Sequence, residues 1–95
     1  MQTIQLQINA SVGLHARPAA LFVKKASQYG SRISVRNVSA DSAWADAKSI
    51  LSILTLGVEQ GHTIEIRADG EDEGQALEGL STLVQNDFAD PANLA

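Results

Sequence analysis

Two residues that could do chemistry together, His15 and Arg17, stand where the sequence predicts that a turn ends and a helix begins. The first backbone N–H groups of a helix have no intrahelical partners and form the positive end of its dipole, so anions bind there readily. The same positive end disfavours the charged imidazolium, which leaves a ring nitrogen of His15 free as a nucleophile. Arg17 adds a guanidinium suited to phosphate oxygens. These residues predict a phosphate site with its own acceptor, and a histidine that only caps the helix is the alternative.

Metal and cofactor chemistry has little support in the sequence. The chain lacks cysteine, which excludes disulfides, thiolate nucleophiles and iron–sulfur ligation. The second histidine, His62, falls at the start of a predicted strand, where we expect a solvated, structural side chain. Two isolated histidines do not make a metal site, and no G-x-x-x-x-G-K-[ST] loop for a nucleotide is present. We therefore expect no metal and no cofactor.

Length and composition indicate one globular domain. The chain has 95 residues, of which 44% are hydrophobic, which is typical of a folded domain rather than a disordered segment. Its first residues lack the basic end and apolar run of a signal peptide, and no stretch approaches the roughly 18 apolar residues of a membrane span. We expect a cytoplasmic protein with no membrane partner.

Positive and negative residues are separated along the chain. Residues 1–40 contain five Lys and Arg and no acid, whereas residues 41–95 contain eleven Asp and Glu with only Lys48 and Arg67. Either this asymmetry has no function and the charges are simply solvated, or it forms a basic face that attracts an acidic partner or a phosphate. The net charge of -4 and the scarcity of aromatic residues argue against nucleic acid as a partner.

Strands are predicted where apolar and polar residues alternate, in residues 4–8, 32–36 and 62–68, with a short further strand around Trp44. Alternation of this kind places one face of a strand on a core and the other toward water. The sheet is therefore expected to have one covered and one open face.

Helices are predicted where apolar residues recur every three or four positions. They run from Ala16 toward a stop at Gly30, from the N-cap Ser49 to Gly57, and onward from the acids of residues 71–73. The order strand, helix, strand, strand, helix, strand, helix predicts an α+β fold with a mainly antiparallel four-stranded sheet covered on one face by helices.

The second predicted helix has more apolar residues than one face can bury. Ile50, Ile53 and Leu56 share a face that can pack on the sheet, while Leu51 and Leu54 lie on another. We expect these two leucines to be left exposed.

One motif resembles the active-site signature of HPr, the histidine-containing phosphocarrier family of the bacterial sugar phosphotransferase system: Gly13-Leu14-His15-Ala16-Arg17-Pro18-Ala19. A second, correctly spaced match follows in Ala47-Lys48-Ser49-Ile50-Leu51 and Leu56-Gly57-Val58. The resemblance implies an HPr-like open-faced sandwich of order βαββαβα over residues 1–88, with three helices on one face of the sheet. Residues 89–95 would form a tail, and the chain from Asp87 onward is typical of a frayed end.

The resemblance implies that His15 accepts a phosphoryl group from phosphorylated enzyme I, itself charged by phosphoenolpyruvate, and donates it to enzyme IIA domains for sugar uptake. In the family the acceptor is the Nδ1 atom of the ring, and the positions of Ala16 and Arg17 help to hold the phosphate. Such a protein is a carrier and a substrate of phosphotransferases rather than an enzyme, and we expect a monomer.

Ser49 has a structural and a regulatory interpretation. As an N-cap it would contribute about 1 kcal/mol to its helix, which alone explains a serine there. The resemblance adds phosphorylation by HPr kinase/phosphorylase, whose charge would repel an acidic partner. It also implies that the first two helices bind enzyme I, enzyme IIA domains and, in some bacteria, a catabolite-control transcription regulator, through a docking surface formed by Ala16, Arg17, Ala20, Lys24, Ser27, Leu51, Ser52, Leu54 and Thr55.

Two alternatives and one departure accompany this interpretation. The chain could be a regulatory binding module switched at Ser49, or a phosphocarrier of the related nitrogen branch. The segment 37–46 is about three residues longer than in most relatives, which leaves the register of the third strand open.

Overall fold

The computed structural model describes residues 1–89, which form four strands and three helices in the predicted order. The strands are β1 (Gln2–Gln7), β2 (Arg32–Asn37), β3 (Ala45–Asp46) and β4 (Thr63–Asp69), and the helices are α1 (Ala16–Ala26), α2 (Ile50–Leu54) and α3 (Glu73–Gln85). Within this part of the chain no helix is long and apolar enough to cross a membrane.

The four strands form the predicted antiparallel sheet, and their order within it is β1-β4-β2-β3. β4 lies in the interior of the sheet, where Ile66 faces Ile4 of β1 on one side and Val35 of β2 on the other. The third strand is only two residues long, and Trp44 lies directly before it. Its register places Ala45 opposite Val35.

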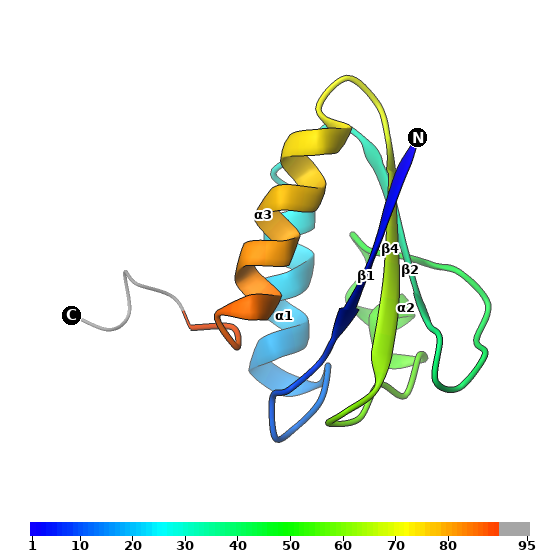
Figure 1. Cartoon of the computed structure of the whole chain (residues 1–95), viewed down its shortest axis with the longest axis vertical. Helices are drawn as coiled ribbons and strands as arrows, with labels where there is room; N and C mark the ends of the chain where they lie inside the picture. Colours follow the sequence, from blue (N-terminus) through cyan, green and yellow to red (C-terminus); the bar gives the residue numbers. More distant parts are fainter. Residues whose placement is uncertain (90–95) are drawn as a thin grey trace.

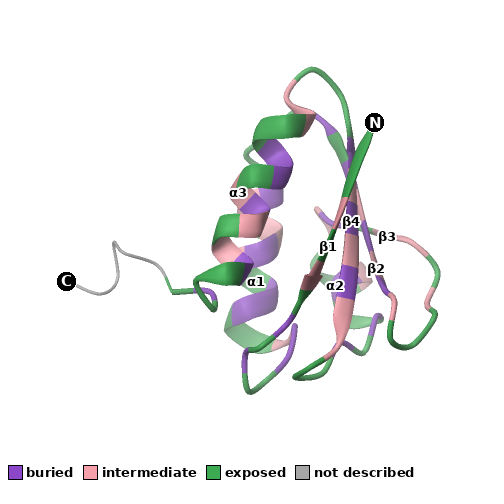
Figure 2. Cartoon of the chain, in the orientation of Figure 1, coloured by how far each residue is buried: buried purple, intermediate pink, exposed green. Residues whose placement is uncertain are grey.

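The helices cover one face of the sheet. Ile33 and Val35 of β2 and Ile64 and Ile66 of β4 are buried, because alternate residues of both strands face the same core. α1 and α3 lie side by side over this face (Figure 1), and their buried residues face the sheet (Figure 2). α2 contacts α1 and β3 and adds the buried Ile53 to the same core. The predicted α+β architecture is confirmed.

The opposite face of the sheet carries charged side chains around Trp44. The guanidinium of Arg67 lies 4.1 Å from the centroid of the indole ring, and that of Arg36 lies 5.4 Å from it. Arg36 also pairs with Glu65 across the strands, at 2.8 Å. The long segment before β3 therefore delivers a cation–π cluster to the open face of the sheet.

Two expectations about the helices are wrong. α1 ends at Ala26 rather than running to Gly30: the amides of Gln28 and Tyr29 donate to carbonyls three residues back instead of four, and the amide of Gly30 donates to Asp72. Ile50 remains 40% exposed. With only five residues, α2 presents too short a surface to bury its first side chain.

The expectation of a frayed end from Asp87 is also wrong for the described residues. Phe88 is buried in the core, and its amide donates to the carbonyl of Leu83 at 2.8 Å. The amide of Asp87 donates to Val84, so the chain turns back under α3 after its last helical residue. The predicted tail beyond residue 89 lies outside the described residues.

Candidate functional site

His15 lies immediately before α1 with an extended backbone, at φ -128° and ψ 172°. Its imidazole makes no capping hydrogen bond, while its carbonyl accepts from the amide of Ala19 at 3.4 Å. Because this is the first hydrogen bond of the helix, the amides of Ala16 and Arg17 have no partner within the helix, and Pro18 has no N–H group. The ring is 33% exposed and is not committed to the helix. The structure therefore contradicts the alternative in which the side chain of His15 only caps the helix.

Ala16 stores backbone strain next to His15. Its φ of +51° lies in the left-handed region, which costs a non-glycine residue about 1–3 kcal/mol. Buried anchors on both sides, Leu14 and Pro18, hold the strained turn in place. The side chains of Ala16 and Arg17 between them are exposed. The turn thus presents the ring of His15 and the guanidinium of Arg17 to solvent on a rigid base.

The loop before His15 is fitted against a second loop, after α2. Gly13 has a φ of +65°, and a β-carbon built on it would lie 2.1 Å from the carbonyl oxygen of Val58. The amide of the fully buried Leu14 donates to the same oxygen at 3.0 Å. The position of His15 therefore depends on the backbone at Val58.

This contact brings an acid to the ring of His15. The Oε1 atom of Glu59 lies 3.7 Å from the Nε2 atom of His15, with the glutamate side chain 67% exposed. Glu59 was not predicted as a site residue, because no local pattern links residues 44 positions apart. The nearest signal was the Leu56-Gly57-Val58 match, which ends one residue earlier.

His62 is structural, as predicted, but it is hydrogen-bonded rather than only solvated. Its Nδ1 atom accepts from the amide of Glu59 at 3.1 Å and lies 3.1 Å from the side-chain amide nitrogen of Asn37. Asn37 is fully buried and also donates to the carbonyl of Leu56 at 3.1 Å. His62 and Asn37 therefore fasten the loop that carries Glu59.

The second motif lies at the start of α2. The hydroxyl of Ser49 accepts from the amide of Ser52 at 3.3 Å, which confirms the predicted N-cap. Leu51 is 74% and Leu54 40% exposed, so the expected unburied apolar face is present.

The remaining positions of the docking surface lie on two helices that contact one another. On α1 the exposed members recur every three or four residues along one side of the helix. On α2 Ser52 is half-buried, and the hydroxyl of Thr55 donates to its carbonyl at 2.6 Å. The positions on α1 and at its C-cap are Ala16, Arg17, Ala20, Lys24 and Ser27, and those on α2 and at its C-cap are Leu51, Ser52, Leu54 and Thr55.

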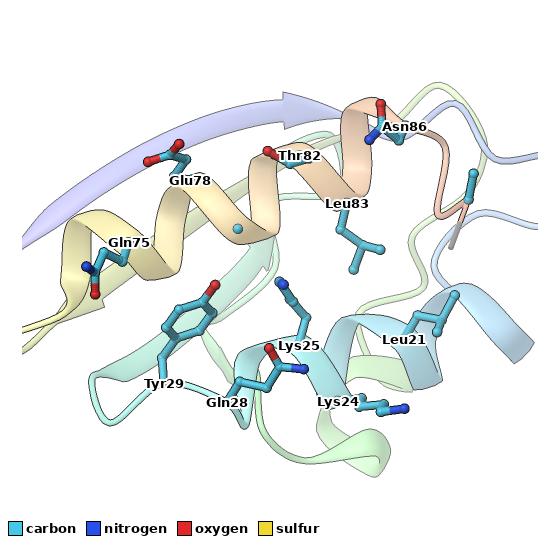
Figure 3. Close-up of a pocket in the computed structure, with 12 residues that line it drawn as sticks. Leu21, Lys24, Lys25, Gln28, Tyr29, Gln75, Glu78, Thr82, Leu83 and Asn86 are labelled. Atoms are coloured by element: carbon cyan, nitrogen blue, oxygen red, sulfur yellow. The ribbon is translucent and has the colours of Figure 1, made fainter. Parts of the chain in front are cut away.

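A hollow of about 560 Å³ lies elsewhere, between α1 and α3 (Figure 3). Lys25 approaches it from α1, Tyr29 from the residues that follow α1, and Leu83 from α3. Neither His15 nor Arg17 lines this hollow. Within residues 1–89 no three His, Asp or Glu side chains gather into a cluster that could hold a metal ion.

Comparisons with known proteins converge on one family. The family described as "PTS HPr component phosphorylation site" matches residues 2–86. The phosphocarrier protein HPr of Haemophilus influenzae is 45% identical over 84 residues, which cover 88% of this chain and 95% of that protein. The multiphosphoryl transfer protein of the same organism is 42% identical over 74 residues, 78% of this chain but only 15% of that longer protein. The crystal structure of HPr-C-His from Thermoanaerobacter tengcongensis superposes with a TM-score of 0.89 at 41% identity, covering 95% of this chain and 98% of that one.

Proposed function

The chain belongs to the HPr family, and from this premise we propose that it is a phosphocarrier that accepts a phosphoryl group on His15 from phosphorylated enzyme I and donates it to enzyme IIA domains. The observation that carries the proposal is the partly exposed ring of His15 at the start of α1, which makes no capping hydrogen bond and lies two residues from the exposed Arg17. In this role the chain is a substrate of phosphotransferases and not itself an enzyme, and it works in the cytoplasm as a monomer.

The transfer needs positioning and charge stabilisation more than covalent assistance. The lone pair of Nδ1 of His15 attacks phosphorus while the bond from phosphorus to enzyme I breaks, and the electron pair of that bond stays with enzyme I. The Nε2 atom of His15 keeps its proton throughout. The guanidinium of Arg17 and the free amides of Ala16 and Arg17 would stabilise the charge on the phosphoryl oxygens.

A carrier must also release its phosphate. A deep, closed site would hold the phosphorylated ring too firmly, whereas His15 and Arg17 lie at the surface and outside the hollow between α1 and α3. The exposed Leu51 and Leu54 and the basic Lys24 suit docking partners that present an apolar patch and acidic groups.

Ser49 is a second proposed modification site, for HPr kinase/phosphorylase where the host has one. Its hydroxyl already faces the amide of Ser52 at the start of α2, so a phosphate there would meet backbone donors and leave the helix folded. The added charge would act on partners that approach α2, among them a catabolite-control transcription regulator in bacteria that use one. Incubation with the kinase and ATP, comparing the parent with Ser49→Ala, tests this site.

The carrier role is tested by incubation with phosphoenolpyruvate and enzyme I, followed by mass spectrometry that retains phosphate. We expect one acid-labile phosphate on the parent and on His62→Asn, which alters the other histidine, and none on His15→Ala. An Arg17→Ala variant should be phosphorylated about tenfold to a hundredfold more slowly, which is less than the roughly 10²–10³-fold cost of losing a donor in a water-excluded site because Arg17 is exposed. An unmodified parent beside a labelled HPr control would overturn the proposal.

A further inference from the structure

We infer that Glu59 is a positioning residue for His15: its carboxylate keeps the ring proton on Nε2 and leaves Nδ1 as the free nitrogen. Glu59 belongs to none of the motif positions that carry the resemblance to the family. Its Oε1 atom lies 3.7 Å from Nε2, which is an ion-pair separation and longer than a hydrogen bond. Glu59 therefore acts on the ring through its charge.

A neutral imidazole carries one proton, on either ring nitrogen. A carboxylate beside Nε2 attracts an N–H group there and repels a lone pair there. The proton is thus favoured on Nε2, and the lone pair stands on Nδ1. Only a ring with an unprotonated Nδ1 can form the nitrogen–phosphorus bond at that atom, so this consequence for transfer rests on the proposed function.

The backbone of Glu59 is fixed, although its side chain is largely exposed. On one side, the carbonyl of Val58 accepts from the amide of Leu14, one residue before His15. On the other, the amide of Glu59 donates to Nδ1 of His62, which is also in contact with the buried Asn37. These bonds hold the backbone of the two loops together, and they keep the carboxylate of Glu59 within reach of the ring of His15.

The ring of His62 supplies an internal reference. Its Nδ1 atom accepts a backbone N–H, so its own proton stands on Nε2 for a reason independent of the Glu59 carboxylate. Both rings can be followed in one long-range ¹H–¹⁵N NMR spectrum, recorded at a pH above the titration of both histidines.

The test compares the parent, Glu59→Gln and the matched control Glu71→Gln, which removes the same charge at the far end of β4. We expect the ratio of Nε2–H to Nδ1–H forms of His15 to fall about two- to fivefold in Glu59→Gln, the scale of an exposed ion pair, and to stay unchanged in the control. The ring of His62 should remain in its Nε2–H form in all three proteins. An unaltered His15 ratio in Glu59→Gln would overturn the inference.

Phosphorylation by enzyme I provides the second measurement. Glu59→Gln should be phosphorylated about two- to fivefold more slowly than the parent, with an unchanged thermal unfolding curve. A rate equal to that of the parent would overturn the role in transfer. The NMR ratio is measured without a partner protein, so it tests the effect of Glu59 on the ring separately from the carrier role. If Glu59→Gln changes the ratio but the parent accepts no phosphate, the carrier role is refuted and the effect on the ring remains.

Discussion

The α-carbon of Gly13 lies so close to the carbonyl oxygen of Val58 that a β-carbon there would come within 2.1 Å of it. Gly57 has a similar φ, +61°, but no atom lies within 4 Å of its potential β-carbon. Gly13→Ala and Gly57→Ala therefore share backbone strain, and only the first adds a steric clash. We expect the free energy of unfolding in urea to fall by about 1–3 kcal/mol more in Gly13→Ala than in Gly57→Ala.

The same clash should displace His15. We expect phosphorylation by enzyme I to slow in folded Gly13→Ala and to remain near that of the parent in Gly57→Ala. Equal losses of stability in the two variants would show that the loops at Gly13 and Val58 are not in tight contact.

His62 should contribute to stability through its Nδ1 acceptor. His62→Leu leaves the amide of Glu59 and one N–H of the buried Asn37 without that acceptor, at a cost of about 1–3 kcal/mol. His62→Asn places an oxygen near the position of Nδ1 and should retain most of that stability. Urea unfolding of the parent and both variants checks the prediction, and two equally destabilised variants would contradict it.

Much of the fold could be predicted because the responsible patterns are local. Alternation identified β1, β2 and β4, and the apolar spacing identified α1 and α3. The exposure of Leu51 and Leu54 also followed from the spacing within α2. The start of a helix indicated His15 and Arg17 as a candidate phosphate site, and the motif that resembles the HPr signature assigned the phosphoryl acceptor to His15.

The missed features depend on distant contacts or on the length of an element. Glu59 reaches His15 only because two loops dock through Val58, and no periodicity encodes that contact. Phe88 is buried because the chain turns back under α3, although its polar neighbours are typical of a free end. Ile50 stays exposed because α2 ends after five residues.

Acid should weaken the junction between α3 and the loop before β2. Hydrogen bonds from the Ser31 hydroxyl and from the amides of Gly30 and Ser31 hold the pKa of Asp72 below the ordinary value of an aspartate. A carboxyl whose pKa is lower in the folded state stabilises the protein above its unfolded pKa, and this stabilisation is lost as the pH falls through the folded pKa. As the pH falls, the free energy of unfolding should therefore decrease less in Asp72→Asn than in the parent.

Denaturant unfolding at a series of pH values below neutrality measures this effect. Part of the acid dependence should persist in Asp72→Asn, because the amide of Gly70 and the N-terminal ammonium also lower the pKa of Glu73. An acid dependence in Asp72→Asn identical to that of the parent would contradict a stabilising role for the Asp72 carboxylate.

Lys24 should steer the encounter with enzyme I. Lys24→Glu reverses a charge on the exposed side of α1, and Arg32→Glu makes the same change on the open face of the sheet. We expect Lys24→Glu to lower kcat/KM for phosphorylation more at about 0.01 M than at about 0.15 M salt, where the Debye length shrinks from roughly 30 to 8 Å. Arg32→Glu should have a much smaller effect. A loss that is independent of salt would point to a direct contact instead of steering.

The interior position of β4 has a consequence for synthesis. β4 is the fourth strand along the chain, yet it pairs with both β1 and β2, and Gln2 finds its partner only at Ala68. While the ribosome has made only the first sixty residues, β1 has no neighbouring strand and β2 has only the short β3. Most of the sheet therefore cannot form before β4 has been made, and until then the strand edges of β1 and β2 that will pair with β4 stay open to other chains.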